Sequence, residues 1–257
     1  MPVHVVEAVG YRPATLRGRS RPLVLSLADG RLAVTKLKGN PQTTHALVAD
    51  LVATRLGRLV GAPVPEPLLV HVPTARLRDI PPLRSRPWIS GLQYGALYVG
   101  GATPVQPATD AAGLVNRHLL PLAALFETWI DNTDLKPSHL LAVPGSAGPS
   151  LLVVDHGHAL PGAPRWTPAS LAAGLADLPD LRALLALHRA AGLAFDLRPA
   201  IDTCMAVSDA QLTELVADVP REWGLPASHA ESLLSFLRRR RASLPAWGAA
   251  LARRASA

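Results

Sequence analysis

Two short stretches decide the fold, because each places an aspartate at the end of an apolar segment. Residues 131–141 read DNTDLKPSHLL, and residues 152–160 read LVVDHGHAL. Apolar runs separated by a Pro/Gly/Ser turn predict a β-hairpin over residues 139–160. The returning strand of this hairpin would bring Asp155 back to the loop that carries Asp134. We therefore expect both carboxylates to face one cleft.

Around this hairpin the sequence divides into a strand-rich beginning and a mostly helical remainder. Short apolar runs over residues 3–36 predict strands, with a hairpin turn at ADG, residues 28–30. Helical periodicity follows, with Asn40 as the expected N-cap, Pro41 in the first turn and Gly61 as the stop. Further helical patterns cover residues 111–130, 170–194, 208–219 and 227–242.

The sequence around the two aspartates resembles two motifs of protein-kinase-like enzymes. Their catalytic loop has the pattern D-L-K-P-E-N, and their metal-binding turn reads D-F-G. Here residues 134–139 read DLKPSH and residues 155–157 read DHG. The resemblance implies that Asp134 orients an attacking hydroxyl, Lys136 offsets phosphoryl charge and Asp155 holds Mg²⁺. Either aspartate alone would fit a helix cap or a turn, but their joint order favours function.

A lysine upstream of the first predicted helix fits the same scheme. Lys36 ends the apolar run in LAVTKLKG, like the strand lysine that pairs with ATP phosphates in the V-A-I-K motif of kinases. In that family an acidic residue on the following helix orients the lysine, and Asp50 is the candidate here, one methylene shorter than the usual glutamate. Lys38 is a competing candidate, because strand alternation puts it on the same face. We prefer Lys36.

The order of the parts along the chain is similar to that of the HipA-like kinase family. The segments that carry this resemblance are KLKGNPQ, RLGRLVGAPVPEP, YGALYVGG, WIDNTD, VVDHGHAL and VPREW. The likeness spans roughly residues 11–242. It implies a two-lobed phosphotransferase that uses ATP and Mg²⁺, in the broad class that includes bacterial toxin kinases acting on a protein serine.

The sequence departs from the family pattern at the second metal position. His139 stands where the family has an asparagine ligand, and imidazole is a poorer partner for Mg²⁺ than an amide oxygen. Three outcomes stay open. Asp155 holds the metal without help, another cation is used, or catalysis is lost while nucleotide binding persists.

The phosphate-binding loop also departs from the usual pattern. No G-x-G-x-x-G precedes Lys36, and LRGRSRP at residues 16–22 is the nearest substitute. Within it, the residues expected near the phosphates are Gly18, Arg19 and Ser20.

Other polar residues near the motifs have two readings each. Asn132 precedes Asp134 at a position where kinases often have histidine, so it either stabilises the loop through side-chain hydrogen bonds or orients the catalytic residues. His156 and His158, taken with His139, suggest a transition-metal site, but no fourth ligand is evident. We expect no zinc site.

Composition limits the remaining possibilities. The chain has 257 residues and is 49% hydrophobic and 18% charged, which is typical of a folded soluble protein. Its net charge of +7 favours anionic partners without choosing among them. The single cysteine, Cys204, excludes an internal disulfide and is expected to be buried. No signal peptide or membrane span is indicated, so we expect a cytoplasmic protein.

Together these patterns predict an α+β, two-lobed, protein-kinase-like fold. Residues 1–97 would form a small nucleotide-binding lobe with an antiparallel sheet and one helix, and residues 98–257 a larger, mainly helical lobe. ATP would lie between them. The expected function is ATP-dependent transfer of a phosphoryl group to a hydroxyl, with a protein Ser or Thr as the favoured acceptor.

Three alternatives stay open at this stage. The chain is a nucleotide-binding pseudokinase, a small-molecule kinase or a basic nucleic-acid binder. The last is not expected, because LRRRRAS at residues 237–243 ends an amphipathic helix, where cations suit the helix dipole and solvent.

Overall fold

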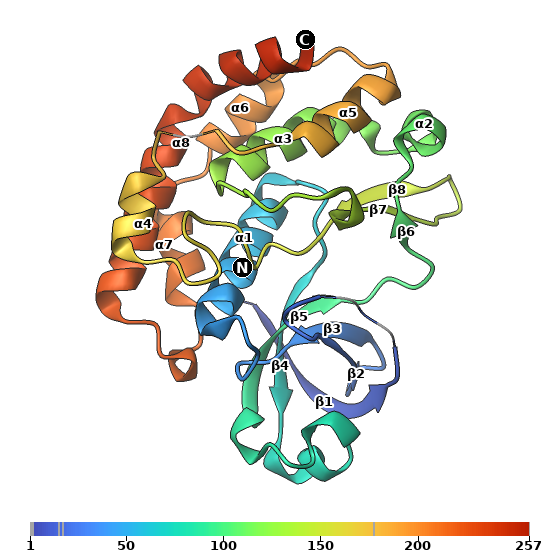
Figure 1. Ribbon diagram of the computed structural model, residues 1–257, viewed down its shortest axis with the longest axis vertical. Coiled ribbons are helices and arrows are strands. Elements are labelled where there is room, and N and C mark those ends of the chain that lie inside the picture. Colours follow the sequence, from blue (N-terminus) through green and yellow to red (C-terminus); the bar gives the residue numbers. More distant parts are fainter. Residues whose placement is uncertain (1–2, 15, 17, 177, 257) are drawn as a thin grey trace.

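The structure is a computed structural model, and it describes residues 3–14, 16, 18–176 and 178–256. Figure 1 shows a lobe of strands below a larger lobe of helices, with the C-terminus at the far end of the helical lobe. The strands of the first lobe are β1 (His4–Arg12), β2 (Leu23–Leu27), β3 (Leu32–Lys36), β4 (Pro67–Val72) and β5 (Gly91–Leu97). β5 ends at the position where we predicted the boundary between lobes.

These five strands close into a barrel in the order β1-β2-β3-β5-β4. The turn at residues 28–30 joins β2 to β3 as an antiparallel hairpin, as predicted. The prediction of an antiparallel sheet is wrong for one pair of strands, because β1 and β4 pair in parallel. A parallel pair needs a long crossover, and the helix between β3 and β4 supplies it. Residues 94–97, at the start of the segment YGALYVGG, belong to β5.

The crossover helix α1 (Thr43–Val60) links the barrel to the helical lobe. It begins later than predicted: the Asn40 side chain accepts a hydrogen bond from the Gln42 backbone N–H at 2.6 Å, which forms a turn ahead of the helix. Gln42 is the N-cap, without a side-chain capping bond. Gly61 ends the helix in the left-handed region at φ 77°, as predicted. Because α1 is buried along most of its length, its position is fixed by both lobes.

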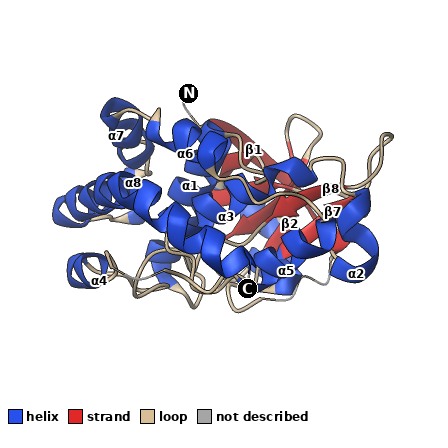
Figure 2. Ribbon diagram, turned by 90° about the horizontal axis from the view of Figure 1, so that it is seen from above, coloured by secondary structure: helices blue, strands red, loops and turns tan. Residues whose placement is uncertain are grey.

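The second lobe is mainly helical, with one small sheet. Its elements are β6 (Thr103–Pro104), α2 (Pro107–Asp110), α3 (Leu120–Trp129), β7 (Leu140–Val143), β8 (Ser150–Val153), α4 (Pro168–Ala173), α5 (Arg182–Ala191), α6 (Arg198–Met205), α7 (Asp209–Ala217) and α8 (Ala227–Ser256). Short 3₁₀ turns lie between residues 111 and 119 of this lobe, and others lie between residues 74 and 89, which connect β4 to β5 in the barrel lobe. Figure 2 shows α3 beside α1 in the middle of this lobe, with α4, α7 and α8 along one side.

Several helix predictions are wrong in their limits. The helix predicted over 111–130 begins only at Leu120, and the one predicted over 170–194 is two helices, α4 and α5. α6 was not predicted, and α8 runs through Pro245 to Ser256. In the described part of the chain, no helix has both the length and the apolar character needed to cross a membrane.

The predicted hairpin is confirmed, and it fixes both ends of the candidate site. β7 and β8 pair antiparallel from Leu140 opposite Val153 to Val143 opposite Ser150. Just beyond the pairing, the Val154 N–H donates to the His139 carbonyl at 3.0 Å. Asp155 therefore leaves the sheet beside His139, at the end of the loop that begins with Asp134.

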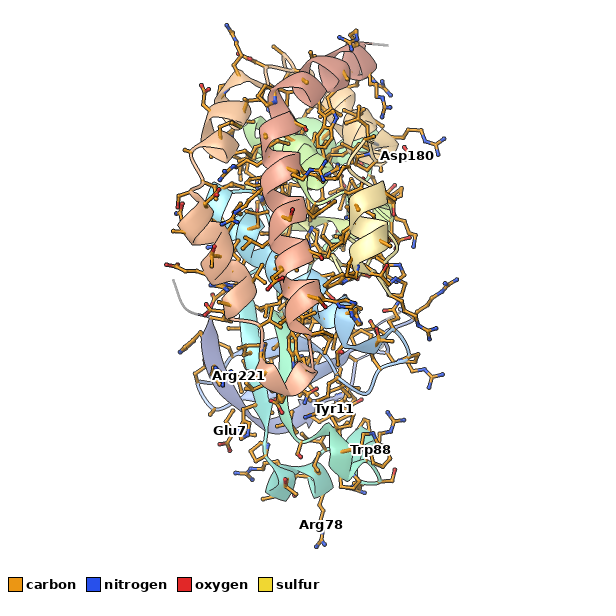
Figure 3. The ribbon with its side chains drawn as sticks, turned by 90° about the vertical axis from the view of Figure 1, so that its left-hand side faces the viewer. Glu7, Tyr11, Arg78, Trp88, Asp180 and Arg221 are labelled. Atoms are coloured by element: carbon orange, nitrogen blue, oxygen red, sulfur yellow. The ribbon has the colours of Figure 1, made fainter. Side chains whose placement is uncertain are left out.

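The segment before α8 joins the two lobes. Glu222 accepts hydrogen bonds from the Leu92 backbone N–H and, at 3.0 Å, from Lys38 Nζ. Trp223 Nε1 donates to the Leu92 carbonyl at 2.8 Å. Figure 3 shows the neighbouring Arg221 where the helical lobe meets the barrel. This contact holds the start of β5 against the helical lobe.

Candidate active site

Three charged side chains from three separate elements meet where the lobes join. Lys36 ends β3, Asp50 lies on the buried face of α1, and Asp155 follows β8. Lys36 Nζ lies 2.7 Å from Asp50 Oδ2 and 2.6 Å from Asp155 Oδ1. Lys38, the competing lysine, pairs instead with Glu222. Strand alternation does not extend to Lys38, because β3 ends at Lys36.

This cluster is charged and largely withdrawn from water. Burial disfavours the charge of Lys36, but the carboxylates of Asp50 and Asp155 outweigh burial and raise the pKa of Lys36 above its usual value. Burial alone would raise the pKa of Asp155, yet the Lys36 ammonium beside it holds that pKa well below the usual range. The Asp50 side chain is 1% exposed, whereas that of Asp155 is 42% exposed. Asp50 thus positions the lysine, while Asp155 keeps a carboxylate face open for a ligand.

The turn after Asp155 brings the backbone close to the cluster. Asp155 adopts φ 68°, a left-handed conformation that is uncommon for a residue other than glycine. At Gly157, a Cβ atom would lie 2.7 Å from Asp50 Oδ2 and 3.2 Å from Lys36 Nζ. Only glycine fits there without displacing the ion pair.

The loop that begins at Asp134 ends at His139, next to Asp155. The Asp134 carboxylate is 29% exposed and lies 2.7 Å from Lys136 Nζ, whose side chain is 56% exposed. The Asp134 backbone N–H donates to Asn132 Oδ1 at 3.1 Å. Lys136 therefore presents an exposed cation and Asp134 a half-buried acid, while Asn132 holds the backbone at Asp134.

His139 lies between the two aspartates, at the position of the expected second metal ligand. Its Nε2 is 3.7 Å from Asp155 Oδ2, and both Asp155 and Asp134 act on its charge. Burial lowers the pKa of His139 despite these acids. Its buried Nδ1 has no hydrogen-bond partner among the residues that the structure describes. Burial thus favours the neutral imidazole beside the Asp155 carboxylate, which is the form in which imidazole binds metals.

A buried network behind the loop was missed by sequence reasoning. Glu127 on α3 is fully buried; its Oε1 lies 2.9 Å from His156 Nε2, and its Oε2 accepts from Asn132 Nδ2 at 2.7 Å. Burial opposes the charge of His156, but Glu127 outweighs it and raises the pKa of His156. The signal was a lone acid within the apolar run LLPLAALFETWI. Glu127 ties the catalytic loop and the DHG turn to α3.

The predicted phosphate loop lies at the edge of a cleft. Gly18 and Arg19 are exposed, Ser20 is buried at 6% exposure, and Arg17 lies outside the described residues. A cleft of about 660 Å³ separates this loop from the start of α1 and from the segment that follows the DHG turn. Its lining residues are Gly18, Arg19, Arg21, Pro41, Gln42, His158, Gly162, Pro164 and Arg165.

The donor set near Asp155 fits a divalent cation shared with a nucleotide. Within the ranges that the structure describes, no three metal-ligating side chains form a closed protein site. Asp155 offers a partly exposed carboxylate and His139 an adjacent neutral imidazole. Nucleotide-bound Mg²⁺ typically takes one or two carboxylates from the protein and its other ligands from phosphates and water. Asp155 would be the main protein ligand and His139 the second.

The fold has a solved counterpart among kinases. The crystal structure of a Helicobacter pylori proinflammatory kinase, CtkA, superposes with a TM-score of 0.60 at 12% identity, covering 99% of this chain and 98% of that chain. The Golgi casein kinase, solved with Mn/ADP bound, gives a TM-score of 0.46 at 12% identity and covers 95% of this chain and 72% of that one. The CtkA match places the chain in the class of protein-kinase-like folds.

A family model narrows this class. The model of the HipA-like kinase family matches residues 11–162, which contain the barrel, α1, the catalytic loop and the DHG turn. The chain belongs to the HipA-like kinase family. This membership supports a phosphotransferase. No curated protein sequence matches the chain.

Proposed function

We propose that this protein transfers the γ-phosphoryl group of ATP to a hydroxyl, with serine or threonine of a protein as the acceptor. The observation that carries the proposal is the contact of Lys36 with both Asp50 and Asp155. In kinases, a strand lysine held by a helix acid grips the nucleotide phosphates, and the acid of the metal-binding turn must lie beside it. This chain brings the three groups together from distant parts of the sequence.

The proposal assigns a role to the other predicted site residues as well as to Lys36. Lys36 binds the α- and β-phosphates, and the loop at Gly18, Arg19 and Ser20 covers them. Asp155, with His139, holds Mg²⁺ or a related divalent cation, which would neutralise charge on the phosphates when bound. Lys136 stabilises the charge of the transferring group.

The transfer itself requires little covalent chemistry from the protein. The oxygen of the acceptor hydroxyl forms a bond to the γ-phosphorus, and the bond from that phosphorus to the β–γ bridging oxygen breaks, which releases ADP. Asp134 orients the hydroxyl and accepts its proton. A half-buried carboxylate next to a cation suits this role, because part of it is accessible to an acceptor.

A transfer assay with γ-labelled ATP tests the proposal. The protein is incubated with Mg²⁺ or Mn²⁺ and a pool of Ser- and Thr-containing peptides, and label is followed in both protein and peptides. Asp134→Ala should lower transfer by roughly 10²- to 10⁴-fold, the usual contribution of a general base. Asp202→Ala, a change at an exposed residue of α6, should leave transfer unchanged. Unchanged transfer in Asp134→Ala would remove this residue from the mechanism.

A second candidate function is nucleotide binding without transfer, and His139 favours it. An imidazole in place of an amide oxygen weakens the second ligand for Mg²⁺. A thermal-shift comparison with ATP, Mg²⁺ and Mn²⁺ separates the two candidates. Stabilisation by ATP without label transfer under any metal would support the pseudokinase.

A further inference from the structure

The cleft next to the DHG turn is rich in arginine side chains. The proposed phosphoryl transfer uses Arg19 but not Arg21 or Arg165. Arg19 and Arg21 come from the loop between β1 and β2, and Arg165 comes from the segment opposite. All three side chains are exposed. Among the residues that the structure describes, the lining contains no aspartate and no glutamate. Three guanidinium groups therefore face a cleft of about 660 Å³ without a lining acid.

These arginines differ from many others in the chain. Arg31, Arg182 and Arg198 each pair with an aspartate two residues earlier in the chain, and Arg31 also pairs with Glu66. The side chains of Arg21 and Arg165, by contrast, have no carboxylate partner among the residues that the structure describes. Unpaired guanidinium groups that converge on one cleft are suited to carboxylate and phosphate ligands.

The far wall of the cleft adds to this preference for anions. Pro41 and Gln42 line it and immediately precede α1, a helix of 18 residues with no acidic side chain in its first turn. The positive end of the helix dipole is therefore not neutralised locally. The Gln42 side chain contacts His158 across the cleft, which links the start of α1 to the segment after the DHG turn.

The cleft begins next to the candidate catalytic centre. His158 follows Asp155 closely in sequence, and Gly157 between them packs against Asp50 and Lys36. Neither Lys36 nor Asp155 lines the cleft, so Arg21 and Arg165 lie beyond these two groups, whereas Arg19 belongs to the loop that would cover the phosphates. Asp134 begins the loop that ends at His139, whose Nε2 lies 3.7 Å from Asp155 Oδ2, so a polypeptide that presents a hydroxyl to Asp134 would extend past this centre towards the cleft.

We propose that the cleft binds acidic side chains that flank the acceptor hydroxyl, so that the preferred substrate is an acidic protein segment. This inference rests on the proposed phosphotransferase function. A nucleic acid is a poorer occupant, because no Phe, Tyr or Trp lines the cleft to stack on a base. Arg19 belongs to the predicted phosphate loop and also lines the cleft, so it serves both.

A binding experiment tests the inference separately from transfer. Two fluorescein-labelled nonapeptides share a central serine and differ only in four flanking positions, which are Asp in one and Asn in the other. Their affinity for the full chain is measured by fluorescence anisotropy at low salt with a non-hydrolysable ATP analogue and Mg²⁺. We expect about tenfold tighter binding of the acidic peptide, a typical sum for several exposed ion pairs.

Charge reversal locates the effect. Arg21→Glu with Arg165→Glu should remove most of the acidic preference. The matched control is Arg78→Glu with Arg189→Glu, which changes the net charge equally at exposed sites outside the cleft; Figure 3 shows Arg78 at the far tip of the barrel. The control should keep the preference. Retained stabilisation by ATP in a thermal-shift assay establishes that each variant is folded.

Several outcomes would overturn the inference. They are equal binding of the two peptides, an equal loss in both double variants, a loss of ATP stabilisation specific to the cleft variant, or oligo-dT binding that matches the acidic peptide and requires the same arginines. Because binding is measured without turnover, an absence of transfer would count against the proposed function and not against the cleft.

Discussion

The two sides of the candidate site differ in how firmly the fold holds them. On the nucleotide side, Lys36 is buried and pairs with two carboxylates, one of which is almost completely enclosed. On the acceptor side, Lys136 is exposed and Asp134 is half-buried, and among the described residues they form an ion pair with each other. His139 next to them retains a buried nitrogen with no hydrogen-bond partner in the described part of the chain.

This difference separates stability from chemistry. The Lys36 cluster joins β3, α1 and the DHG turn, so a change there affects both the lobe packing and the nucleotide. The exposed pair contributes little to folding, because solvent-exposed ion pairs are typically worth less than about 1 kcal/mol. Substitutions of Lys36 or Asp50 should therefore damage folding and binding, whereas substitutions of the Asp134–Lys136 pair should damage transfer alone.

The largest effect is expected for Lys36→Met. The change leaves Asp50 buried without its cation, and breaking a buried ion pair typically costs about 3 kcal/mol or more. Urea denaturation should show this loss, and a thermal-shift assay should show that ATP no longer stabilises the protein. Lys38→Met, which breaks the more exposed pair with Glu222, is the matched control and should keep ATP binding.

A double substitution distinguishes the structural role from the binding role. Lys36→Met with Asp50→Leu removes the unpaired acid and should recover part of the lost stability. ATP stabilisation should stay absent. A double variant that recovers ATP binding would contradict the role of Lys36 in gripping the nucleotide.

The next largest effect is expected for Glu127→Gln, behind the acceptor-side loop. Glutamine keeps the shape but removes the charge that interacts with His156, which should cost about 2 kcal/mol at pH 6, as for a buried hydrogen bond to a charged group. Urea denaturation measures this loss. Thr128→Ser, the neighbouring buried position, is a control for general changes in α3.

The pH dependence of stability gives a second test of the same pair. Because Glu127 raises the pKa of His156 in the folded state, the pair stabilises the protein fully below the unfolded pKa of about 6.5. This stabilisation is lost as the pH rises through the folded pKa. Glu127→Gln should therefore flatten the decrease in stability above pH 6.5. An identical pH profile in the variant would show that His156 is not held protonated.

Much of the fold could be predicted from local sequence signals. The hairpin turn after β2, the end of α1 at Gly61 and the β7–β8 hairpin all follow from turn residues and apolar periodicity, and all are confirmed. The parallel pairing of β1 with β4 could not be predicted, because it depends on barrel closure rather than on either strand's sequence. The helix boundaries around α4 and α6 were missed for a similar reason. Apolar periodicity does not indicate where the chain ends one helix and changes direction to pack the next.

The candidate site was predictable only where a motif marked it. The spacing of the two kinase-like motifs predicted Asp134 and Asp155 as site residues, and the position of Lys36 at the end of a predicted strand indicated that lysine. The pairing of Glu127 with His156 is a long-range contact between α3 and the DHG turn, and only the lone acid in an apolar helix indicated it. The cationic cleft joins residues from three segments, which no local pattern connects.

Substitution of His139 tests the role of this residue, which stands where the family pattern has an asparagine metal ligand. His139→Asn supplies an amide oxygen beside Asp155, and oxygen ligands suit Mg²⁺ better than imidazole does. The wild-type protein should transfer phosphate better with Mn²⁺ than with Mg²⁺, and the variant should shift this preference towards Mg²⁺ by about fivefold to tenfold, or roughly 1 kcal/mol. Transfer rates at saturating ATP under each metal measure the shift. An unchanged metal preference would exclude His139 as a ligand.

The smallest effect is expected where the lobes are joined, at Glu222→Gln. Glu222 is 37% exposed and pairs with Lys38 while it accepts from the Leu92 backbone. Glutamine can still accept that hydrogen bond, so only the exposed ion pair is lost, at a cost of about 0.5 kcal/mol. Because the contact fixes the barrel against the helical lobe rather than touching the site, the Michaelis constant for ATP should rise slightly while the metal preference stays constant. Asp218→Asn weakens the contact of Arg55 on α1 with the end of α7. It should also raise the Michaelis constant for ATP slightly while the metal preference stays constant. A change in metal preference in either variant would mean that the lobe contact reaches the acceptor side, and the separation between the two sides would fail.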